Sequence, residues 1–202
     1  MKHSYYEGNN QNVIIMLHGT GGDENDLIQI AKYIDQDAHL LGIRGNVKEG
    51  LANRYFKRNT DGSFDEEDLN FRSHELYDKI QDLLKEYDLE GHKINLIGYS
   101  NGANILIHIL KLYSSNFEKA VLLHPSSGIE ETKFKKQKHL RVLITYGIND
   151  PFISEASFKN LKEDLENSKI QTEEFKHLHG HQITQEELEA AKIFYWSNDV
   201  NA

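Results

Sequence analysis

Short apolar runs alternate with helical patterns along this chain, and this alternation restricts the possible folds more than any other feature. The runs lie at residues 13–17, 40–43, 93–97, 120–123, 142–145 and 170–175. Between the runs, apolar residues recur three or four positions apart, as they do on one face of a helix. Continuously apolar strands that alternate with helices predict an α/β fold, with a mostly parallel sheet flanked by helices on both faces.

Helix boundaries are indicated by capping residues. Asp23 is the expected N-cap of a helix over 27–34, and a further helix is expected over about 102–113. Thr184 is followed three residues later by Glu187, which together form a capping box. The capping box predicts that the last helix of the chain begins at this point.

Length and charge limit the class of protein. A chain of 202 residues buries a full core as one domain, residues 1–202. The net charge of −9 argues against a nucleic-acid partner, and the basic run 133–141 is expected to be a solvated loop. The absence of cysteine excludes disulfides and thiolate metal sites. No signal peptide and no apolar stretch near the roughly 18 residues of a membrane span are found, so we expect a cytoplasmic location.

The segment GYSNGAN, residues 98–104, lies where an apolar strand stops and a helix begins. Gly98, Ser100 and Gly102 fit the pattern G-x-S-x-G. A sharp turn from strand to helix brings the residues on either side of its apex together, so both must lack bulk while the apex side chain projects above the sheet. The pattern predicts a nucleophilic Ser100. The alternative is a glycine-rich turn in which the serine only caps the helix.

A serine nucleophile needs a base that is held by a third group. In this architecture the acid and then the histidine follow the serine along the chain. Asp150 lies in GINDP after the run 142–145, and His181 lies in HLHGHQIT before the capping box. We therefore expect a catalytic set of Ser100, Asp150 and His181. The alternative roles are turn formation for Asp150 and a plain loop position for His181.

Three histidines at alternate positions offer a second interpretation of the same segment. His177, His179 and His181 follow the pattern H-x-H-x-H, which is found in some metal clusters. No carboxylate or cysteine lies at a matching spacing. We therefore predict no metal site here.

Acyl transfer builds negative charge on the carbonyl oxygen, and fixed N–H donors must face that charge. The N–H of Asn101 lies at the helix start behind the serine. The segment LHGTGGDEND, residues 17–26, leaves the first apolar run on glycines that allow the backbone to approach a ligand, and Thr20 is the best candidate for a second N–H donor. The segment lacks the Gly-Lys-Ser/Thr end of a P-loop and the spacing of a dinucleotide site. Thr20 and Asn101 are thus the expected oxyanion hole.

Residues that follow parallel strands lie at the sheet edge where ligands bind. We expect His18, Phe56, His124 and Phe152 to line the substrate pocket on this basis. Phe56 belongs to the long polar stretch 44–70. Loops of that length are often functional, and this one is expected to form a wall of the pocket.

The segments LHGTGGDEND, GYSNGAN, GINDP and GHQITQEELEAAK occur in an order that resembles the phospholipase/carboxylesterase family of α/β-hydrolases, which includes acyl-protein thioesterases. The stretch FDEEDL is most similar to small bacterial carboxylesterases linked to hydroquinone and catechol stress. This resemblance implies an α/β-hydrolase fold without a large lid domain, a Ser100–Asp150–His181 triad and Thr20 and Asn101 as oxyanion-hole amides. It also implies no metal and no organic cofactor.

The combined prediction is a serine hydrolase that cleaves carboxylic esters of small acyl or aromatic substrates through an acyl-enzyme. Thioesters, lysophospholipids and lactones are alternative substrates for the same residues. Outside enzymes, the alternative is a catalytically silent, ligand-binding member of the same fold. The expected partner is a small-molecule ester or thioester. A homodimer is left open, because the apolar residues 193–196 belong either to the core or to a dimer face.

Overall fold

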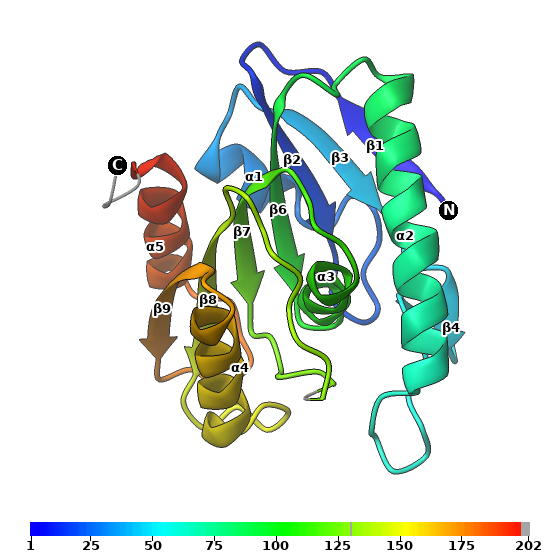
Figure 1. Cartoon of the computed structure of the whole chain (residues 1–202), viewed down its shortest axis with the longest axis vertical. Coiled ribbons are helices and arrows are strands. Elements are labelled where there is room, and N and C mark those ends of the chain that lie inside the picture. The colour runs from blue at the N-terminus through cyan, green and yellow to red at the C-terminus, as the bar shows by residue number, and fades with distance from the viewer. Residues whose placement is uncertain (130, 199–202) are drawn as a thin grey trace.

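The computed structural model describes residues 1–129 and 131–198 and contains a seven-stranded sheet between two layers of helices (Figure 1). The strand order is β1-β3-β2-β6-β7-β8-β9. β1 runs antiparallel to β3, and the other neighbouring strands are parallel. The strands are β1 (His3–Tyr6), β2 (Asn12–Leu17), β3 (His39–Ile43), β6 (Lys93–Tyr99), β7 (Phe117–Leu123), β8 (Arg141–Gly147) and β9 (Gln171–His177). The predicted mostly parallel sheet is confirmed.

Helices cover both faces of this sheet, as the apolar strands require. The helices are α1 (Ile28–Ile34), α2 (Glu66–Glu86), α3 (Asn101–Leu112), α4 (Glu155–Asn167) and α5 (Gln185–Trp196). Residues of α2, α3 and α4 form one core layer, and residues of α1 and α5 form the other (Figure 1). Along β2, Val13 and Ile15 belong to the first layer whereas Ile14 and Met16 belong to the second. Successive side chains of a strand point to opposite faces, so each apolar strand supplies both cores.

The predicted helix cap is confirmed at α5 and is wrong at α1. The hydroxyl of Thr184 accepts the N–H of Glu187, and the Glu187 carboxylate accepts the N–H of Thr184, which completes the capping box. At α1, Leu27 is in the cap position and no side chain caps the helix. Asp23 lies too early in the chain for that role. Its Oδ1 instead accepts the N–H of Asn25 in the turn that precedes α1.

Two features of the fold lie outside the sequence prediction. β1 forms one edge of the sheet without a continuous apolar run, because an edge strand is only partly covered. The stretch expected to be one long loop contains an antiparallel hairpin of β4 (Val47–Glu49) and β5 (Ala52–Arg54). Strands of three residues are too short to give a periodic signal, so neither was predicted.

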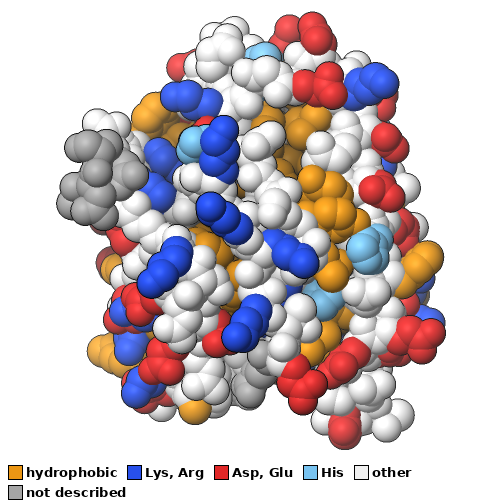
Figure 2. Space-filling model, in the orientation of Figure 1, with side chains coloured by type: hydrophobic (Ala, Val, Ile, Leu, Met, Phe, Trp, Pro, Cys, Tyr) orange, Lys and Arg blue, Asp and Glu red, His pale blue; other side chains and the backbone are white. Residues whose placement is uncertain are grey.

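The basic run 133–141 is largely a solvated segment, as predicted. Its exposed lysines lie outside any helix or strand, and they are Lys133, Lys135, Lys136 and Lys138. Figure 2, which draws the molecule in the orientation of Figure 1, shows Lys and Arg side chains gathered over the middle and left of the visible face. Arg141 differs from the lysines, because it is the buried first residue of β8 and donates to Glu173 at 3.0 Å.

The apolar end of α5 is divided between the core and the surface. Phe194 and Tyr195 are buried, whereas Ile193 is 73% exposed and Trp196 is 53% exposed. The core alternative for residues 193–196 therefore holds for the middle pair, and a dimer face formed by the two exposed side chains stays a prediction. Among the helices of the described part of the chain, none combines the length and the apolar character needed to cross a membrane.

Candidate active site

β6 turns into α3 at Ser100, and this turn has the strained geometry that the sequence predicts. Ser100 has φ of 50° and ψ of −111°, a conformation that residues other than glycine rarely adopt. A Cβ on Gly98 would lie 2.8 Å from the backbone nitrogen of Ala103, and a Cβ on Gly102 would lie 2.1 Å from the carbonyl oxygen of Leu17. Both positions therefore require glycine. The turn presents the serine at the carboxyl edge of the sheet.

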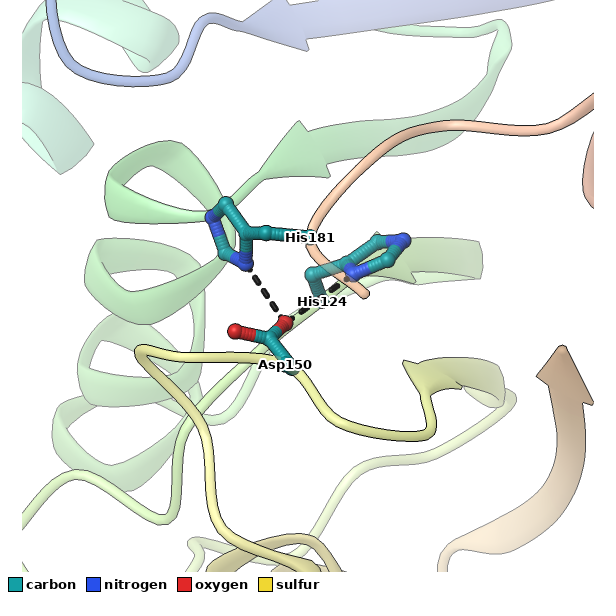
Figure 3. A group of neighbouring side chains, drawn as sticks. All are labelled: His124, Asp150 and His181. Carbon is teal, nitrogen blue, oxygen red and sulfur yellow. Dashed lines mark hydrogen bonds and ion pairs between the residues drawn. The ribbon is translucent and has the colours of Figure 1, made fainter. Parts of the chain in front are cut away.

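The side chains of Ser100, His181 and Asp150 lie together at this edge. The distance from Ser100 Oγ to His181 Nε2 is 3.0 Å, and the distance from His181 Nδ1 to Asp150 Oδ2 is 2.6 Å. Asp150 lies in the turn that follows β8, and His181 lies in the loop between β9 and α5. Figure 3 shows the ring of His181 directed at the Asp150 carboxylate. These contacts have the arrangement that a nucleophile, a base and an orienting acid require, and the catalytic roles of the three residues stay a prediction.

The carboxylate of Asp150 is fixed from its backbone side. Asp150 Oδ1 accepts the N–H groups of Phe152 at 2.8 Å and Ile153 at 3.1 Å. Burial by itself raises the pKa of Asp150, but the hydrogen bond from His181 and the other donors outweigh burial and bring the pKa below its ordinary value. An ionised Asp150 accepts the Nδ1 proton of His181. This tautomer leaves a lone pair on Nε2, the nitrogen that faces Ser100 Oγ.

The loop that carries His181 is held at two points. The hydroxyl of Tyr99 donates to the carbonyl oxygen of His181 at 2.7 Å, and burial raises the pKa of Tyr99 to about 12, which keeps this hydroxyl protonated. Gly180 has φ of 59°. A Cβ on Gly147 would lie only 1.6 Å from the carbonyl oxygen of Gly180, so the end of β8 and the loop are in direct backbone contact. Gly147 is needed because a side chain there would collide with the loop, and Gly180 is needed because its positive φ favours glycine.

The segment that contains Thr20 is anchored by the hairpin that sequence analysis missed. Thr20 Oγ1 accepts a hydrogen bond from Arg54 Nη1 at 2.7 Å, and the N–H of Gly21 donates to the carbonyl oxygen of Asn53 at 2.9 Å. Arg54 is 3% exposed. Burial lowers its pKa to about 10, which still leaves it a cation at neutral pH. The β5 strand therefore fixes the loop expected to supply the second oxyanion donor.

Asn101 is buried, and its side chain serves the fold. Asn101 Oδ1 accepts the N–H of Tyr55 at 2.7 Å. The Tyr55 hydroxyl in turn accepts the N–H of His18 at 3.0 Å and donates to the carbonyl oxygen of Ile43 at 2.6 Å. The N–H of Asn101 belongs to the first turn of α3, where N–H groups have no partner within the helix. That this N–H and that of Thr20 bind an oxyanion stays a prediction.

Three of the four residues expected to line the substrate pocket lie in the interior. His18, Phe56 and His124 have at most 1% of their surface exposed. A side chain without accessible surface does not contact a substrate in this structure, so the expectation for these three residues is corrected. Their rings follow strands as expected but pack inward, where they support the frame of the site. Phe152 is 71% exposed, and its ring centroid lies 4.9 Å from that of His181.

A groove of about 630 Å³ lies between the segment 59–66 and the segment 126–129, which follows β7. The N–H of Ser126 donates to Asn104 Oδ1 at 2.8 Å. Asn104 belongs to α3, the helix that begins directly after Ser100, so one wall of the groove is anchored to that helix. Part of the stretch 44–70 therefore walls a groove, through residues other than Phe56. The lining residues are Asn59, Gly62, Ser63, Phe64, Asp65, Glu66, Ser126, Ser127, Gly128 and Ile129.

Sequence analysis did not predict that His124 and Glu187 lie on the far side of Asp150. His124 Nδ1 lies 3.3 Å from Asp150 Oδ2, and His124 Nε2 lies 3.0 Å from Glu187 Oε1. His177 Nε2 lies 3.2 Å from Glu187 Oε2. Figure 3 shows His124 and His181 approaching Asp150 from two sides. The signal in the sequence was weak, since Glu187 is explained by its capping role alone.

The three alternate histidines do not converge on one point. His177 is buried and faces Glu187, His179 is exposed, and His181 faces Asp150. Two other sets of ligand-type side chains do converge among the described residues. They are His124, Asp150 and His181, and His124, His177 and Glu187. If a metal ion were bound, these sets and not the H-x-H-x-H pattern would hold it.

The model of the dienelactone hydrolase family matches residues 55–197 of the chain. The chain belongs to the dienelactone hydrolase family. It is 39% identical over 195 residues to "Putative hydrolase MhqD" of Bacillus subtilis (strain 168), a match that covers 96% of this chain and 98% of the relative. The expected relationship to α/β-hydrolase carboxylesterases is therefore confirmed.

Solved structures of relatives agree with this assignment. The Bacillus cereus carboxylesterase has a TM-score of 0.93 at 40% identity, over 96% of this chain and 93% of that chain. YahD with malic acid has a TM-score of 0.88 at 36% identity, over 96% of this chain and 97% of that chain. Esterase PE8, at 18% identity and a TM-score of 0.80, shares the fold. The protein is thus an esterase-type hydrolase with the α/β-hydrolase fold, and residues 1–129 and 131–198 contain no large lid.

Proposed function

We propose that this enzyme is a serine hydrolase that cleaves carboxylic esters of small acyl or aromatic substrates through an acyl-enzyme. The observation that supports the proposal is the chain of contacts from Ser100 to His181 to Asp150, at 3.0 Å and 2.6 Å. Nucleophilic acyl transfer requires an accessible nucleophile, a base and a group that orients the base. The serine in a positive-φ turn, the histidine with its proton on Nδ1 and the buried carboxylate fit these three roles.

In this mechanism, His181 Nε2 accepts the proton of Ser100 as Oγ attacks the acyl carbonyl carbon. The carbonyl oxygen becomes an anion that faces the N–H groups of Thr20 and Asn101. The C–O bond to the leaving alcohol then breaks, and His181 donates its proton to that oxygen. His181 takes a proton from water, which attacks the acyl carbon; the bond to Ser100 Oγ then breaks, the acid leaves, and His181 returns the proton to Oγ. Asp150 stays ionised and stabilises the imidazolium in both half-reactions.

The substrate proposal is supported by shape and by relatives. Phe152 is an exposed aromatic ring beside His181, and it offers a face to an acyl chain or an aromatic alcohol. The similar Bacillus cereus structure is a carboxylesterase, and the YahD structure contains malic acid, a small carboxylate. Thioesters and lysophospholipids are alternative substrates for the same residues. A cytoplasmic location and a homodimer also stay predictions, and light scattering in solution tests the second.

The deciding experiment is labelling with a fluorophosphonate, followed by peptide mass spectrometry. We expect one adduct on Ser100, and we expect Ser100→Ala to lower kcat on p-nitrophenyl esters by roughly 10⁶. An unlabelled protein, or a Ser100→Ala variant with near-normal turnover, would contradict the serine mechanism. A series of p-nitrophenyl esters run beside acyl-thioesters then defines the preferred acyl length and leaving group.

A further inference from the structure

His124 lies behind the triad, in a position that the mechanism above does not use. It follows β7 directly and has φ of 53°, a conformation that a residue other than glycine rarely adopts. Its side chain has no exposed surface, and it lies between two buried carboxylates. Nδ1 is 3.3 Å from Asp150 Oδ2, and Nε2 is 3.0 Å from Glu187 Oε1. Figure 3 shows the contact with Asp150.

Glu187 is surrounded by donors. The hydroxyl of Thr145 donates to Glu187 Oε1, and the N–H of Thr184 donates to Glu187 Oε2 at 3.1 Å. Burial by itself raises the pKa of Glu187, but the hydrogen bond from His124 and the other donors outweigh burial and lower the pKa. Glu187 is therefore an ionised carboxylate that only accepts hydrogen bonds.

His124 consequently faces a carboxylate oxygen at each ring nitrogen, and its Nε2 also lies 3.3 Å from His177 Nε2. The two Nε2 atoms meet different oxygens of Glu187, His124 at Oε1 and His177 at Oε2. Each nitrogen of His124 must carry a hydrogen to make the carboxylate contacts favourable, and an imidazole with two N–H groups is a cation. Burial by itself lowers the pKa of His124, but the hydrogen bonds and charges of Glu187 and Asp150 outweigh burial and raise the pKa. The two carboxylates, at 3.3 Å from Nδ1 and 3.0 Å from Nε2, are the contacts that favour an imidazolium over a neutral ring that accepts from His177.

The proton of His177 is located by the backbone. His177 Nδ1 accepts the N–H of His179 at 3.0 Å, so the ring proton lies on Nε2. Nε2 then donates to Glu187 Oε2, at 3.2 Å. A metal ligand needs a lone pair on that nitrogen. His177, Glu187 and His124 therefore form a hydrogen-bonded cluster, although their ligand atoms lie close enough together for a metal ion.

The groups that face His124 come from every neighbouring element. Besides the two carboxylates, they are Tyr99 at the end of β6, His177 at the end of β9 and His181 before α5, with ring centroids 5.9, 5.1 and 5.2 Å away. Tyr99 keeps its proton because burial raises its pKa to about 12. His177 is neutral, since burial, the largest cause, lowers its pKa. The carboxylates are therefore the fixed charges that act on His124.

We propose that His124, as a buried imidazolium, and Glu187 are positioning residues that hold Asp150 toward His181 and balance the charge of proton transfer. The inference rests on the proposed serine-hydrolase function. At rest, two carboxylates and one imidazolium leave a single negative charge behind His181. When His181 takes the proton of Ser100, this charge is neutralised. Without Glu187, the positive charge of His124 would cancel the negative charge of Asp150. Glu187 offsets the charge of His124, so a net negative charge remains to stabilise the protonated His181.

Nitrogen NMR of the wild-type protein, labelled with ¹⁵N-histidine, tests the charge of His124 without an activity assay. We expect both ring nitrogens of His124 to be protonated near pH 7, with the signal assigned by its absence in His124→Gln. A neutral His124 overturns the proposal. Metal analysis of the same purified protein is expected to find no stoichiometric metal, and a metal ion bound at His124 and Glu187 also overturns it.

The acidic limb of the kcat/KM profile tests the positioning role, because it reports the protonation of His181. His124→Gln removes a positive charge near His181, so we expect the limb to move to higher pH by about one unit and kcat to fall about tenfold. The double variant His124→Gln/Glu187→Gln removes one charge of each sign, and its limb is expected to return toward the wild-type position. His139→Gln, at an exposed site before β8, is the matched control.

A purely structural role would lower kcat without these opposite shifts. The proposal is therefore contradicted if the limb stays in place in His124→Gln, or if the double variant does not move it back. Circular dichroism and the Tm of each variant identify loss of folding. Failure of the serine mechanism itself is recognised separately, because fluorophosphonate labelling of Ser100 and the activity of Ser100→Ala do not depend on His124.

Discussion

The two halves of the candidate site are built by different means. The nucleophile half, from Gly98 to Gly102, depends on backbone geometry, with a positive φ at Ser100 and carbonyl and amide groups packed where side chains would be. The acid–base half depends on buried charge, with Asp150 held by His181 and His124. Steric requirements leave a short pattern in the sequence, whereas buried charges gather from distant segments. The nucleophile half is therefore readable from a pentapeptide. In the acid–base half, Asp150 and His181 are predicted only from their order along the chain, and the contacts of Asp150 with His124 and of His124 with Glu187 are not predicted at all.

The strongest test of the acid–base half is Asp150→Asn. The amide keeps the shape of the side chain but presents the wrong hydrogen-bonding group to His181, so we expect kcat to fall by about 10⁴. Steady-state kinetics on a p-nitrophenyl ester measure this loss, with the exposed Asp82→Asn on α2 as the control. A loss below tenfold would mean that Asp150 does not orient the base.

The nucleophile half is tested by Gly102→Ala. The added methyl would lie 2.1 Å from the carbonyl oxygen of Leu17, so β2 and α3 must separate. We expect the free energy of unfolding in urea to fall by about 3 kcal/mol and esterase activity to be largely lost. Gly91→Ala is the matched control, because nothing lies within 4 Å of its added Cβ, and it is expected to change stability by less than about 0.5 kcal/mol. Equal stability of the two variants would contradict the steric argument.

The pH dependence of stability separates the halves further. Asp150 and Glu187 have lowered pKa values in the folded state, so their contribution is present above their ordinary values of 3.8 and 4.5 and is lost as the pH falls through the lowered values. His124 has a raised pKa, so its contribution is complete below 6.5 and is lost as the pH rises through the raised value. Together these contributions are largest between about pH 4.5 and 6.5.

Urea unfolding from pH 3 to pH 9 measures this profile. In Glu187→Gln, one carboxylate no longer titrates and His124 loses a partner, so the profile is expected to be flatter at both ends. Gly102→Ala alters only backbone packing, and its curve is expected to run parallel to that of the wild type at lower stability. A Glu187→Gln curve that is parallel to that of the wild type would contradict the claim that buried charges stabilise the acid–base half.

The smallest effect is expected at the substrate side. Phe152→Ala removes an exposed ring whose centroid lies 4.9 Å from that of His181. We expect KM for an aromatic ester to rise about fivefold with kcat nearly unchanged, because the ring contacts substrate and not the reacting atoms. Leu51→Ala, a 98% exposed side chain in the β4–β5 turn, serves as control. A change in kcat alone would assign Phe152 to the acid–base half.

Sequence reasoning predicted the layers of the fold, and it selected Ser100, Asp150 and His181, whose side chains are in contact in the structure while their catalytic roles stay a prediction. Continuous apolar strands and G-x-S-x-G are local consequences of burial and of steric contact. It failed for His18, Phe56 and His124, because a residue after a strand can turn to the pocket or to the interior, and only packing decides between them. It also missed the role of Glu187 in the cluster, since the capping box already accounts for an acid at that position.

The capping box links the start of α5 to the chemistry of the site. The Glu187 carboxylate that accepts the N–H of Thr184 also faces His124, so one side chain belongs to both structures. Helix ends fray before helix centres do, and fraying of this turn withdraws the carboxylate from the cluster. On heating, catalysis is therefore expected to fail at a lower temperature than the sheet.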